Sequence, residues 1–271
     1  MLDRYIPFML LAIDTGNTTT HIGGFDGDRL AFSFRLASTH TRTVDEASLL
    51  IRQVLRENAV EPGSIDGAVL CSVVPLLTPV IEQALRAACG VDPLVVTCHL
   101  KLPIRLEVPL PEQVGTDRIA NAVAFWTEHR RAGVVVDFGT ATNFDVVSAA
   151  GAYIGGALAA GLESAADRLA QKAAQLFKVG FGPPESAIGS TTEEALRSGF
   201  YYGAVGAVDE IVTRITRELG GDAHVVATGG LADIVARESK TIKAVDPILT
   251  LKGLRVISSC QSLSAWPYKV L

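Results

Sequence analysis

The chain has 271 residues, of which 48% are hydrophobic and 20% are charged, so it can bury the core of one large or two medium domains. Its formal net charge is −5, which excludes a global basic surface for nucleic acid or an anionic membrane. The cysteines are scattered, with no CxxC pair and no histidine at metal spacing: Cys71, Cys89, Cys98 and Cys260. This pattern argues against zinc and a disulfide framework, and it indicates a reducing cytoplasm.

The N-terminal apolar residues fit two interpretations, a signal peptide and a core strand. Residues 6–13 are apolar and follow Arg4, which faintly resembles a signal peptide. The run is short, lacks a small-residue cleavage site and ends at Asp14, so a core strand is the better interpretation. Met9 directly precedes this strand, and residues 1–8 are therefore expected to be an extension with no role in the fold. No stretch is long enough to span a membrane.

The first half of the chain predicts the order β-β-β-α-β-α-β, a mixed sheet with helices packed on it. Strands are expected at residues 10–14, 20–25, 30–37, 67–74 and 93–97. A hairpin turn is expected at residues 26–28. Thr43 and Glu46 form a capping-box pattern, and the helix behind it places five apolar residues on one face: Ala47, Leu50, Ile51, Val54 and Leu55. A second helix is expected at residues 76–88, ended by Gly90, and residues 98–111 are expected to form a loop.

The second half repeats this order. Strands are expected at residues 134–137, 143–148, 153–159 and 224–227. Helices are expected at residues 116–128 and 161–177. A long helix capped by Thr191 and Glu194 is expected to run to about residue 219, and a further helix is expected after Gly230. Residues 178–188 are expected to form a loop that could act as a lid. The predicted domains are residues 9–115 and 116–271.

Two similar strand–turn segments, one in each half, are the main functional signal. Residues 10–20 read LLAIDTGNTTT and residues 134–144 read VVVDFGTATNF. Each turn can present backbone N–H groups to a phosphate, while the carboxylate of Asp14 or Asp137 can hold a cation or its bound water. One such turn could equally be an ordinary Asp-initiated hairpin. Two of them indicate a duplicated domain with its ligand between the halves.

Two further motifs each have a plain structural alternative. Asp117 and Arg118 start the expected helix at 116–128, where such a pair is usually a cap with a solvated charge. Thr228-Gly229-Gly230 follows a strand and lets a flat group approach the backbone closely, or it is a simple strand-to-helix turn. Asp117 and Arg118 lie between the two phosphate-type turns in the sequence, which favours a functional role for this pair.

Taken in order, these motifs resemble the sugar kinase/Hsp70/actin superfamily and, within it, the type III pantothenate kinases. The resemblance runs over roughly residues 9–256 and is carried by Asp14-Thr15-Gly16-Asn17-Thr18, Gly115-Thr116-Asp117-Arg118, Asp137-Phe138-Gly139-Thr140-Ala141-Thr142, Gly155-Gly156, Thr192-Glu193-Glu194-Ala195 and Thr228-Gly229-Gly230. It implies an α/β fold of duplicated ribonuclease H-like (actin-like ATPase) domains, each a mixed five-stranded sheet flanked by helices.

The resemblance also implies a function: ATP-dependent phosphorylation of pantothenate to 4'-phosphopantothenate, the first step of coenzyme A biosynthesis. It implies a cytoplasmic homodimer that needs Mg2+ and K+ or NH4+, with no nucleic acid or membrane partner. Asp117 would accept the proton of the attacking hydroxyl, and Asp137 would ligate the monovalent cation. ATP would contact Asp14, Thr15, Gly16, Asn17, Thr18, Thr19, Thr20, His21 and Thr140. Pantothenate would contact Gly115, Thr116, Asp117, Arg118, Thr192 and Val108.

The chain departs from the family pattern on the acceptor side. Residues 106–109 contain no aromatic residue where the family usually has a tyrosine, Ala160 replaces a proline, and Asn143 stands where a second threonine is common. Asp14 and Asp145 remain alternatives for positioning magnesium. A non-catalytic nucleotide-binding regulator, like accessory transcription factors in this family, is the alternative function. A superfamily kinase or phosphatase with another acceptor is a third.

Overall fold

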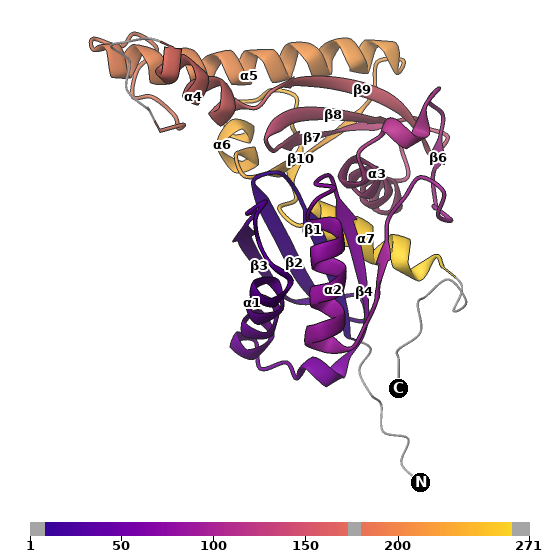
Figure 1. Cartoon of the computed structure of the whole chain (residues 1–271). Helices are drawn as coiled ribbons and strands as arrows, with labels where there is room; N and C mark the ends of the chain where they lie inside the picture. The colour runs from indigo at the N-terminus through magenta and orange to yellow at the C-terminus, as the bar shows by residue number, and fades with distance from the viewer. Residues whose placement is uncertain (1–8, 173–179, 262–271) are drawn as a thin grey trace. The chain divides into compact units, whose positions relative to one another are not determined.

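The computed structural model describes residues 9–172 and 180–261, which form two compact units (Figure 1). Of the described residues, unit 1 comprises 9–103, 110–127 and 250–261, and unit 2 comprises 104–109, 128–172 and 180–249. The expected extension at residues 1–8 and the end of the helix expected at 161–177 lie outside the described residues.

Unit 1 contains a five-stranded mixed sheet in the order β3-β2-β1-β4-β5. The strands are β1 (Met9–Thr15), β2 (Thr19–Asp26), β3 (Arg29–Ala37), β4 (Ile65–Ser72) and β5 (Pro93–Val95). β1 pairs with β2 in antiparallel and with β4 in parallel orientation. The expected hairpin turn is present, with Gly27 at a positive φ of 59°, so all five strands expected in the first half are confirmed.

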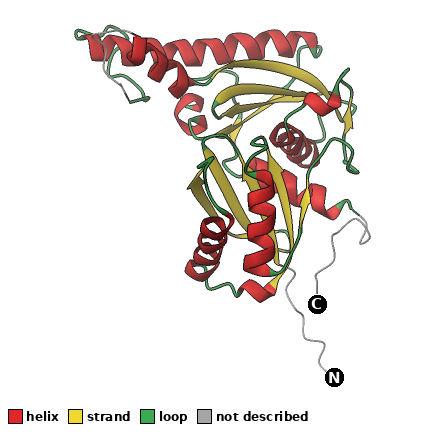
Figure 2. Ribbon diagram, viewed as in Figure 1, coloured by secondary structure: helices red, strands yellow, loops and turns green. Residues whose placement is uncertain are grey.

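One face of this sheet packs against α1 (Val44–Glu57) and α2 (Thr78–Cys89), which lie side by side (Figure 2). The capping box predicted at Thr43 and Glu46 is present, and Gly90 ends α2 in the left-handed conformation. The α1 face that contacts the core contains Ala47, Ile51, Val54 and Leu55, whereas Leu50 is only partly buried. Two short 3-10 turns, η1 (Pro62–Ser64) and η2 (Pro111–Gln113), complete the loops.

Two further helices of unit 1 come from the middle and the end of the chain: α3 (Thr116–His129), as far as Thr127, and α7 (Leu249–Ser259) from Thr250. A Cβ atom on Gly253 of α7 would lie 1.9 Å from the carbonyl oxygen of Ala120 in α3, so this close helix contact requires glycine. The Thr250 hydroxyl donates to the Asn121 side chain at 2.8 Å, which satisfies two buried polar groups.

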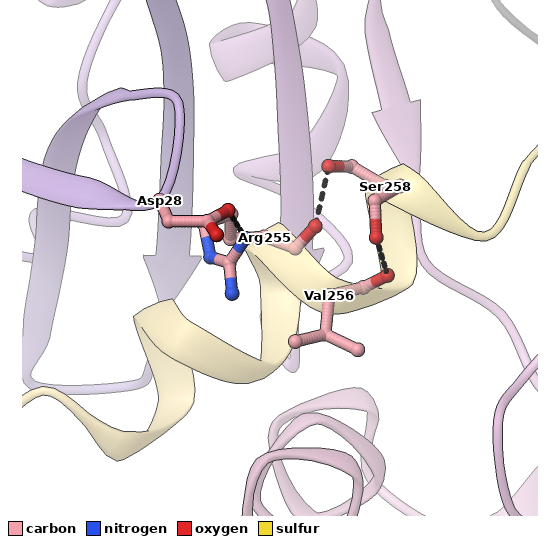
Figure 3. A network of polar contacts seen from close by, with 5 residues as sticks. Asp28, Arg255, Val256 and Ser258 are labelled. Carbon is pink, nitrogen blue, oxygen red and sulfur yellow. Dashed lines mark hydrogen bonds and ion pairs between the residues drawn. The ribbon is translucent and has the colours of Figure 1, made fainter. Parts of the chain in front are cut away.

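The end of the described chain is also linked to the first hairpin. Arg255 in α7 forms an ion pair with Asp28 in the β2–β3 turn (Figure 3). The Ser258 hydroxyl donates to the carbonyl of Arg255 within the same helix. Because the Asp28 side chain is 91% exposed, the pair contributes little energy. The helix therefore depends on its apolar contacts, such as Leu251 against Gly23.

Unit 2 repeats the sheet of unit 1. Its order is β11-β10-β7-β8-β9-β6, formed by β6 (Arg105–Leu106), β7 (Gly133–Phe138), β8 (Ala141–Val147), β9 (Ala152–Ala160), β10 (His224–Gly229) and β11 (Ala244–Val245). β7 pairs with β8 in antiparallel and with β10 in parallel orientation. Strands β7 to β11 therefore match β1 to β5 in order and direction, and the duplication predicted from the two turns is confirmed.

The helices of unit 2 are α4 (Leu162–Lys172), α5 (Thr192–Glu218) and α6 (Ala232–Ala236). The α5 capping box at Thr191 and Glu194 is present as predicted. Buried residues of α5 and α6 pack on β7, β8 and β10 to form the core. Among the described helices, the 27-residue α5 included, none has an apolar stretch that could cross a bilayer.

One expectation needs correction. The segment 98–111 was expected to be a loop, but Arg105 and Leu106 pair with Ala152 and Tyr153 as β6, so the second sheet has six described strands instead of five. The predicted domains, residues 9–115 and 116–271, remain a prediction; the compact units group residues 116–127 and 250–261 with unit 1. The packing of α3 and α7 is a long-range property that local sequence patterns do not report.

Candidate active site

In unit 1, a carboxylate lies at the end of the central strand. Asp14 is the penultimate residue of β1 and is partly exposed. The parallel register places Cys71 of β4 beside it, and the Cys71 thiol donates a hydrogen bond to Asp14 Oδ1 at a sulfur–oxygen distance of 3.1 Å. The thiol is fully buried, so this bond orients the carboxylate from inside the protein.

The turn after Asp14 is compact. The backbone N–H of Gly16 donates to the carbonyl of Thr19 at 3.0 Å, and Asn17 and Thr18 are exposed at the tip. A Cβ atom on Gly16 would lie 3.2 Å from the Thr19 carbonyl oxygen. The tip therefore offers backbone N–H groups and short polar side chains to a ligand.

Three predicted ATP contacts near this turn have buried side chains. Thr15 is fully buried, and Thr20 is 2% exposed with its hydroxyl 2.9 Å from that of Ser38. His21 is 7% exposed; burial, aided by the Arg35 charge, lowers its pKa to about 4, so it is neutral at pH 7. Of the predicted contacts in this segment, those that are exposed or partly exposed are Asp14, Gly16, Asn17, Thr18 and Thr19.

The start of α3 brings a second carboxylate to the same part of unit 1. Thr116 joins α3 to β4, since its hydroxyl oxygen accepts from the N–H of Ser72 at 3.2 Å. Asp117 follows, and its Oδ1 accepts from the N–H of Arg118 at 2.8 Å. A Cβ atom on Gly115 would lie 2.4 Å from Asp117 Oδ1, so glycine leaves the space that this carboxylate occupies.

The charges around Cys71 connect these carboxylates. Burial raises the pKa of the Cys71 thiol, and the negative charges of Asp14 and Asp117 raise it further, so the thiol stays protonated. Burial also raises the pKa of Asp117, against the opposing effects of the Arg118 N–H and guanidinium. A carboxylate with a raised pKa is the better proton acceptor at neutral pH.

The unit 2 turn has the same plan with different neighbours. Asp137 is the penultimate residue of β7, and Gly139 donates its N–H to the carbonyl of Ala141 at 3.0 Å. Gly229 of β10 has a φ of 92°, and a Cβ atom there would lie 2.7 Å from Asp137 Oδ1. Thr140 is exposed, and its carbonyl accepts from the Ser164 hydroxyl at 3.2 Å. Gly229 thus allows the backbone to approach the carboxylate.

The remaining predicted residues of unit 2 differ in exposure. Thr192 is exposed at the first position of α5, and Val108 is partly buried after β6. Asp145 is fully buried and accepts from the Tyr153 hydroxyl at 3.2 Å. The partly exposed Asp14 is therefore the better placed of the two alternatives for a magnesium ion.

The donor atoms fit hard cations. No group of three or more His, Cys, Asp or Glu side chains that could hold a metal ion occurs in the described part of the chain. The carboxylates of Asp14, Asp117 and Asp137 with neighbouring carbonyl and hydroxyl oxygens suit ions that keep water or substrate oxygens as ligands. The protonated Cys71 thiol, by contrast, does not suit a thiolate-binding metal.

Sequence reasoning missed Cys71 and Ser72, which the structure brings to Asp14 and Thr116. The scattered cysteine pattern gave no reason to single out Cys71. The repeat itself was a usable signal. In each half, the first strand contains the turn Asp, so the strand that pairs with it in parallel must supply the residues beside that Asp.

Known proteins match the chain over nearly its whole length. The family model described as type III pantothenate kinase matches residues 10–214. Relatives named type III pantothenate kinase include proteins from Geobacter sulfurreducens and Frankia alni, which are 43% and 46% identical over 249 and 250 residues. Each alignment covers 92% of this chain and 98% of the relative.

Solved structures agree on the fold. The ethanolamine utilization protein EutJ from Carboxydothermus hydrogenoformans matches with a TM-score of 0.55 and 14% identity, over 93% of this chain and 90% of that one. A Campylobacter jejuni protein named for the Baf family of transcriptional activators matches with a TM-score of 0.57 and 19% identity, over 92% and 97% of the two chains. At these identities the likeness concerns the fold alone. The family model and the curated relatives show that the chain belongs to the type III pantothenate kinase family.

Proposed function

We propose that this protein transfers the γ-phosphoryl group of ATP to pantothenate and forms 4'-phosphopantothenate, the first step of coenzyme A biosynthesis. Membership of the type III pantothenate kinase family over 92% of the chain supports this function. The observation that carries the mechanism is that consecutive residues of β4 contact both segments: Cys71 bonds to Asp14, and Ser72 bonds to Thr116, which directly precedes Asp117.

Asp117 is the proton acceptor in this proposal. It lies at the start of α3, is held by the Arg118 N–H and has a raised pKa. As pantothenate's hydroxyl attacks, Asp117 Oδ takes its proton. Gly115, Thr116, Arg118, Thr192 and Val108 are the proposed pantothenate contacts. A regulator without catalysis has no need of such a base, so the enzyme is favoured.

The proposal assigns ATP contacts to the strand–turn segments. The proposed contacts are Asp14, Thr15, Gly16, Asn17, Thr18, Thr19, Thr20 and His21 in unit 1 and Thr140 in unit 2. Asp14 would hold Mg2+ or its water, and Asp137 would hold K+ or NH4+. When bound, these cations offset the charge of the phosphates. The turns align those phosphates with backbone N–H groups, which explains how a chain of net charge −5 binds a polyanion.

A turnover assay tests the proposal. The purified protein is incubated with ATP, Mg2+, K+ and pantothenate, and phosphopantothenate is detected by mass spectrometry. Product that depends on pantothenate is expected. Nucleotide binding without product from a folded protein would contradict the kinase and favour the regulator, whereas ADP release with another hydroxyl acceptor would indicate a different substrate.

The monovalent cation and the homodimer are finer parts of the proposal. Replacing K+ by Na+ should lower the wild-type rate, and Asp137→Ala should weaken ATP binding and abolish the response to K+. Asp222→Ala is the control, because Asp222 is an exposed carboxylate of the same unit. An Asp137→Ala protein that still responds to K+ would reject the cation role. Sedimentation velocity tests whether the protein is a homodimer.

A further inference from the structure

The register of unit 1 brings one side-chain donor to the turn carboxylate. β1 and β4 run parallel, with Asp14 opposite Cys71 and Ile13 opposite Leu70. Because successive strand residues point to opposite faces, Ile13 and Leu70 enter the core that α1 and α2 cover, and Asp14 and Cys71 share the other face. The contact between Asp14 and Cys71 is therefore a consequence of strand pairing.

The contact is a hydrogen bond from a buried donor. The Cys71 Sγ–Asp14 Oδ1 distance is 3.1 Å, and Cys71 is 0% exposed, so water does not compete for the thiol. Asp14, by contrast, is partly exposed. A bond from the inside can fix the direction of this carboxylate while leaving its outer side to a ligand.

Unit 2 independently places a donor at the equivalent position. Thr228 of β10 lies opposite Asp137 of β7, in the same parallel register as Cys71 opposite Asp14. Thr228 is 3% exposed. Both halves of the duplication therefore have a buried residue with a side-chain hydrogen-bond donor on the strand beside the turn carboxylate. A thiol in one half and a hydroxyl in the other share this one property.

We propose that Cys71 is a positioning residue for phosphoryl transfer, whose S–H group holds the Asp14 carboxylate in the direction needed for binding ATP and its cation. This inference rests on the proposed function and assigns Cys71 no contact with substrate. The thiol acts through Asp14, so its loss should be seen in ATP binding before it is seen in the chemical step.

The kinetic test uses two variants and a matched control. Cys71→Ala removes the donor and should raise KM for ATP about threefold to tenfold with little change in kcat, as for one net hydrogen bond. Cys71→Ser keeps an O–H donor and should restore KM to within about twofold of wild type. Cys89→Ala removes another buried thiol from the same unit and should leave both constants unchanged. A KM for Cys71→Ala equal to wild type would overturn the proposal, as would a Cys71→Ser protein as impaired as Cys71→Ala.

A second readout needs neither substrate nor turnover. In the infrared spectrum of the ligand-free protein, the S–H stretching band that disappears in Cys71→Ser should lie at lower frequency than the band of a thiol that makes no hydrogen bond. A Cys71 band at the frequency of an unbonded thiol would overturn the proposal, even if Cys71→Ala fails to fold. The dissociation constant of a non-hydrolysable ATP analogue, measured for wild type and each variant, gives the nucleotide affinity independently of turnover. These two arms separate a failure of this inference from a failure to phosphorylate pantothenate.

Discussion

The two strand–turn segments are alike in backbone and different in their surroundings. In unit 1 the N–H of Val73 donates to the carbonyl of Thr15 at 3.1 Å, and in unit 2 the N–H of Gly230 donates to the carbonyl of Phe138 at 3.1 Å. The donor and acceptor residues of these two bonds occupy equivalent positions in the parallel pairs β1–β4 and β7–β10. The duplication therefore extends from strand order to individual backbone hydrogen bonds.

The difference lies in what surrounds each carboxylate. Asp14 has the Cys71 thiol beside it, and the charge of Asp117 acts on that same thiol. Asp137 has Thr228 opposite it and, in addition, the backbone of Gly229 close to its carboxylate. The hairpins also differ by one residue, since the first closes from Gly16 to Thr19 and the second from Gly139 to Ala141. The same turn therefore lies beside a thiol on which a second carboxylate acts in unit 1, and beside a close backbone segment in unit 2.

The largest expected effect concerns the carboxylate at the start of α3. Asp117→Asn should lower kcat about 100-fold to 10,000-fold, because the proton acceptor is lost. Since the pKa of Asp117 is raised in the folded state, its stabilising contribution is present below pH 3.8 and is lost as the pH rises through the folded pKa. The ionised carboxylate therefore costs stability at pH 7, and the variant should melt at an equal or higher temperature.

Calorimetry and steady-state kinetics measure the two effects. Asp45→Asn is the matched control, because Asp45 is likewise the second residue of a unit 1 helix but is exposed. It should change neither kcat nor the melting temperature appreciably. An active Asp117→Asn enzyme would show that the base is elsewhere.

A smaller effect tests the backbone contact of unit 2. Gly229→Ala places a methyl group 2.5 Å from the Phe138 carbonyl at a φ of 92°, so it should lower the free energy of unfolding by about 1–3 kcal/mol. Gly16→Ala in unit 1 should cost less, because its nearest contact is 3.2 Å. Urea denaturation measures both. Gly230→Ala, which meets no atom within 4 Å, is the control, and equal stabilities for all three variants would refute the difference between the turns.

The smallest expected effect is a difference in acid sensitivity. Opposite Asp14 lies His21, whereas opposite Asp137 lies Asn143, which does not titrate. The pKa of His21 falls from 6.5 to about 4 on folding, so its stabilising contribution is present above pH 6.5 and is lost as the pH falls towards 4.

As the pH falls through 7, 5.5 and 4.5, hydrogen exchange should therefore show a larger increase in opening around the Asp14 turn than around the Asp137 turn. His21→Gln should reduce this difference, whereas His40→Gln, at an exposed histidine of the same unit, should not. Equal pH dependence of wild type and His21→Gln would contradict the prediction.

Local patterns in the sequence determined the elements and the family. Hydrophobic periodicity, the capping boxes at Thr43 and Thr191, and Gly90 act through neighbouring residues, so they could be read without a structure. The paired Asp turns predicted the duplication because each copy retained the same short pattern. The ordered motifs identified the pantothenate kinase family on the same basis.

Only the tertiary structure decided which distant residues meet. Cys71 is 57 residues from Asp14, and Thr116 is 44 residues from Ser72, yet strand register and helix docking bring each pair into contact. The return of α7 to unit 1 and the addition of β6 to the second sheet arise in the same way. Long-range pairing depends on how whole elements bury their faces, and a local pattern contains no information on the partner.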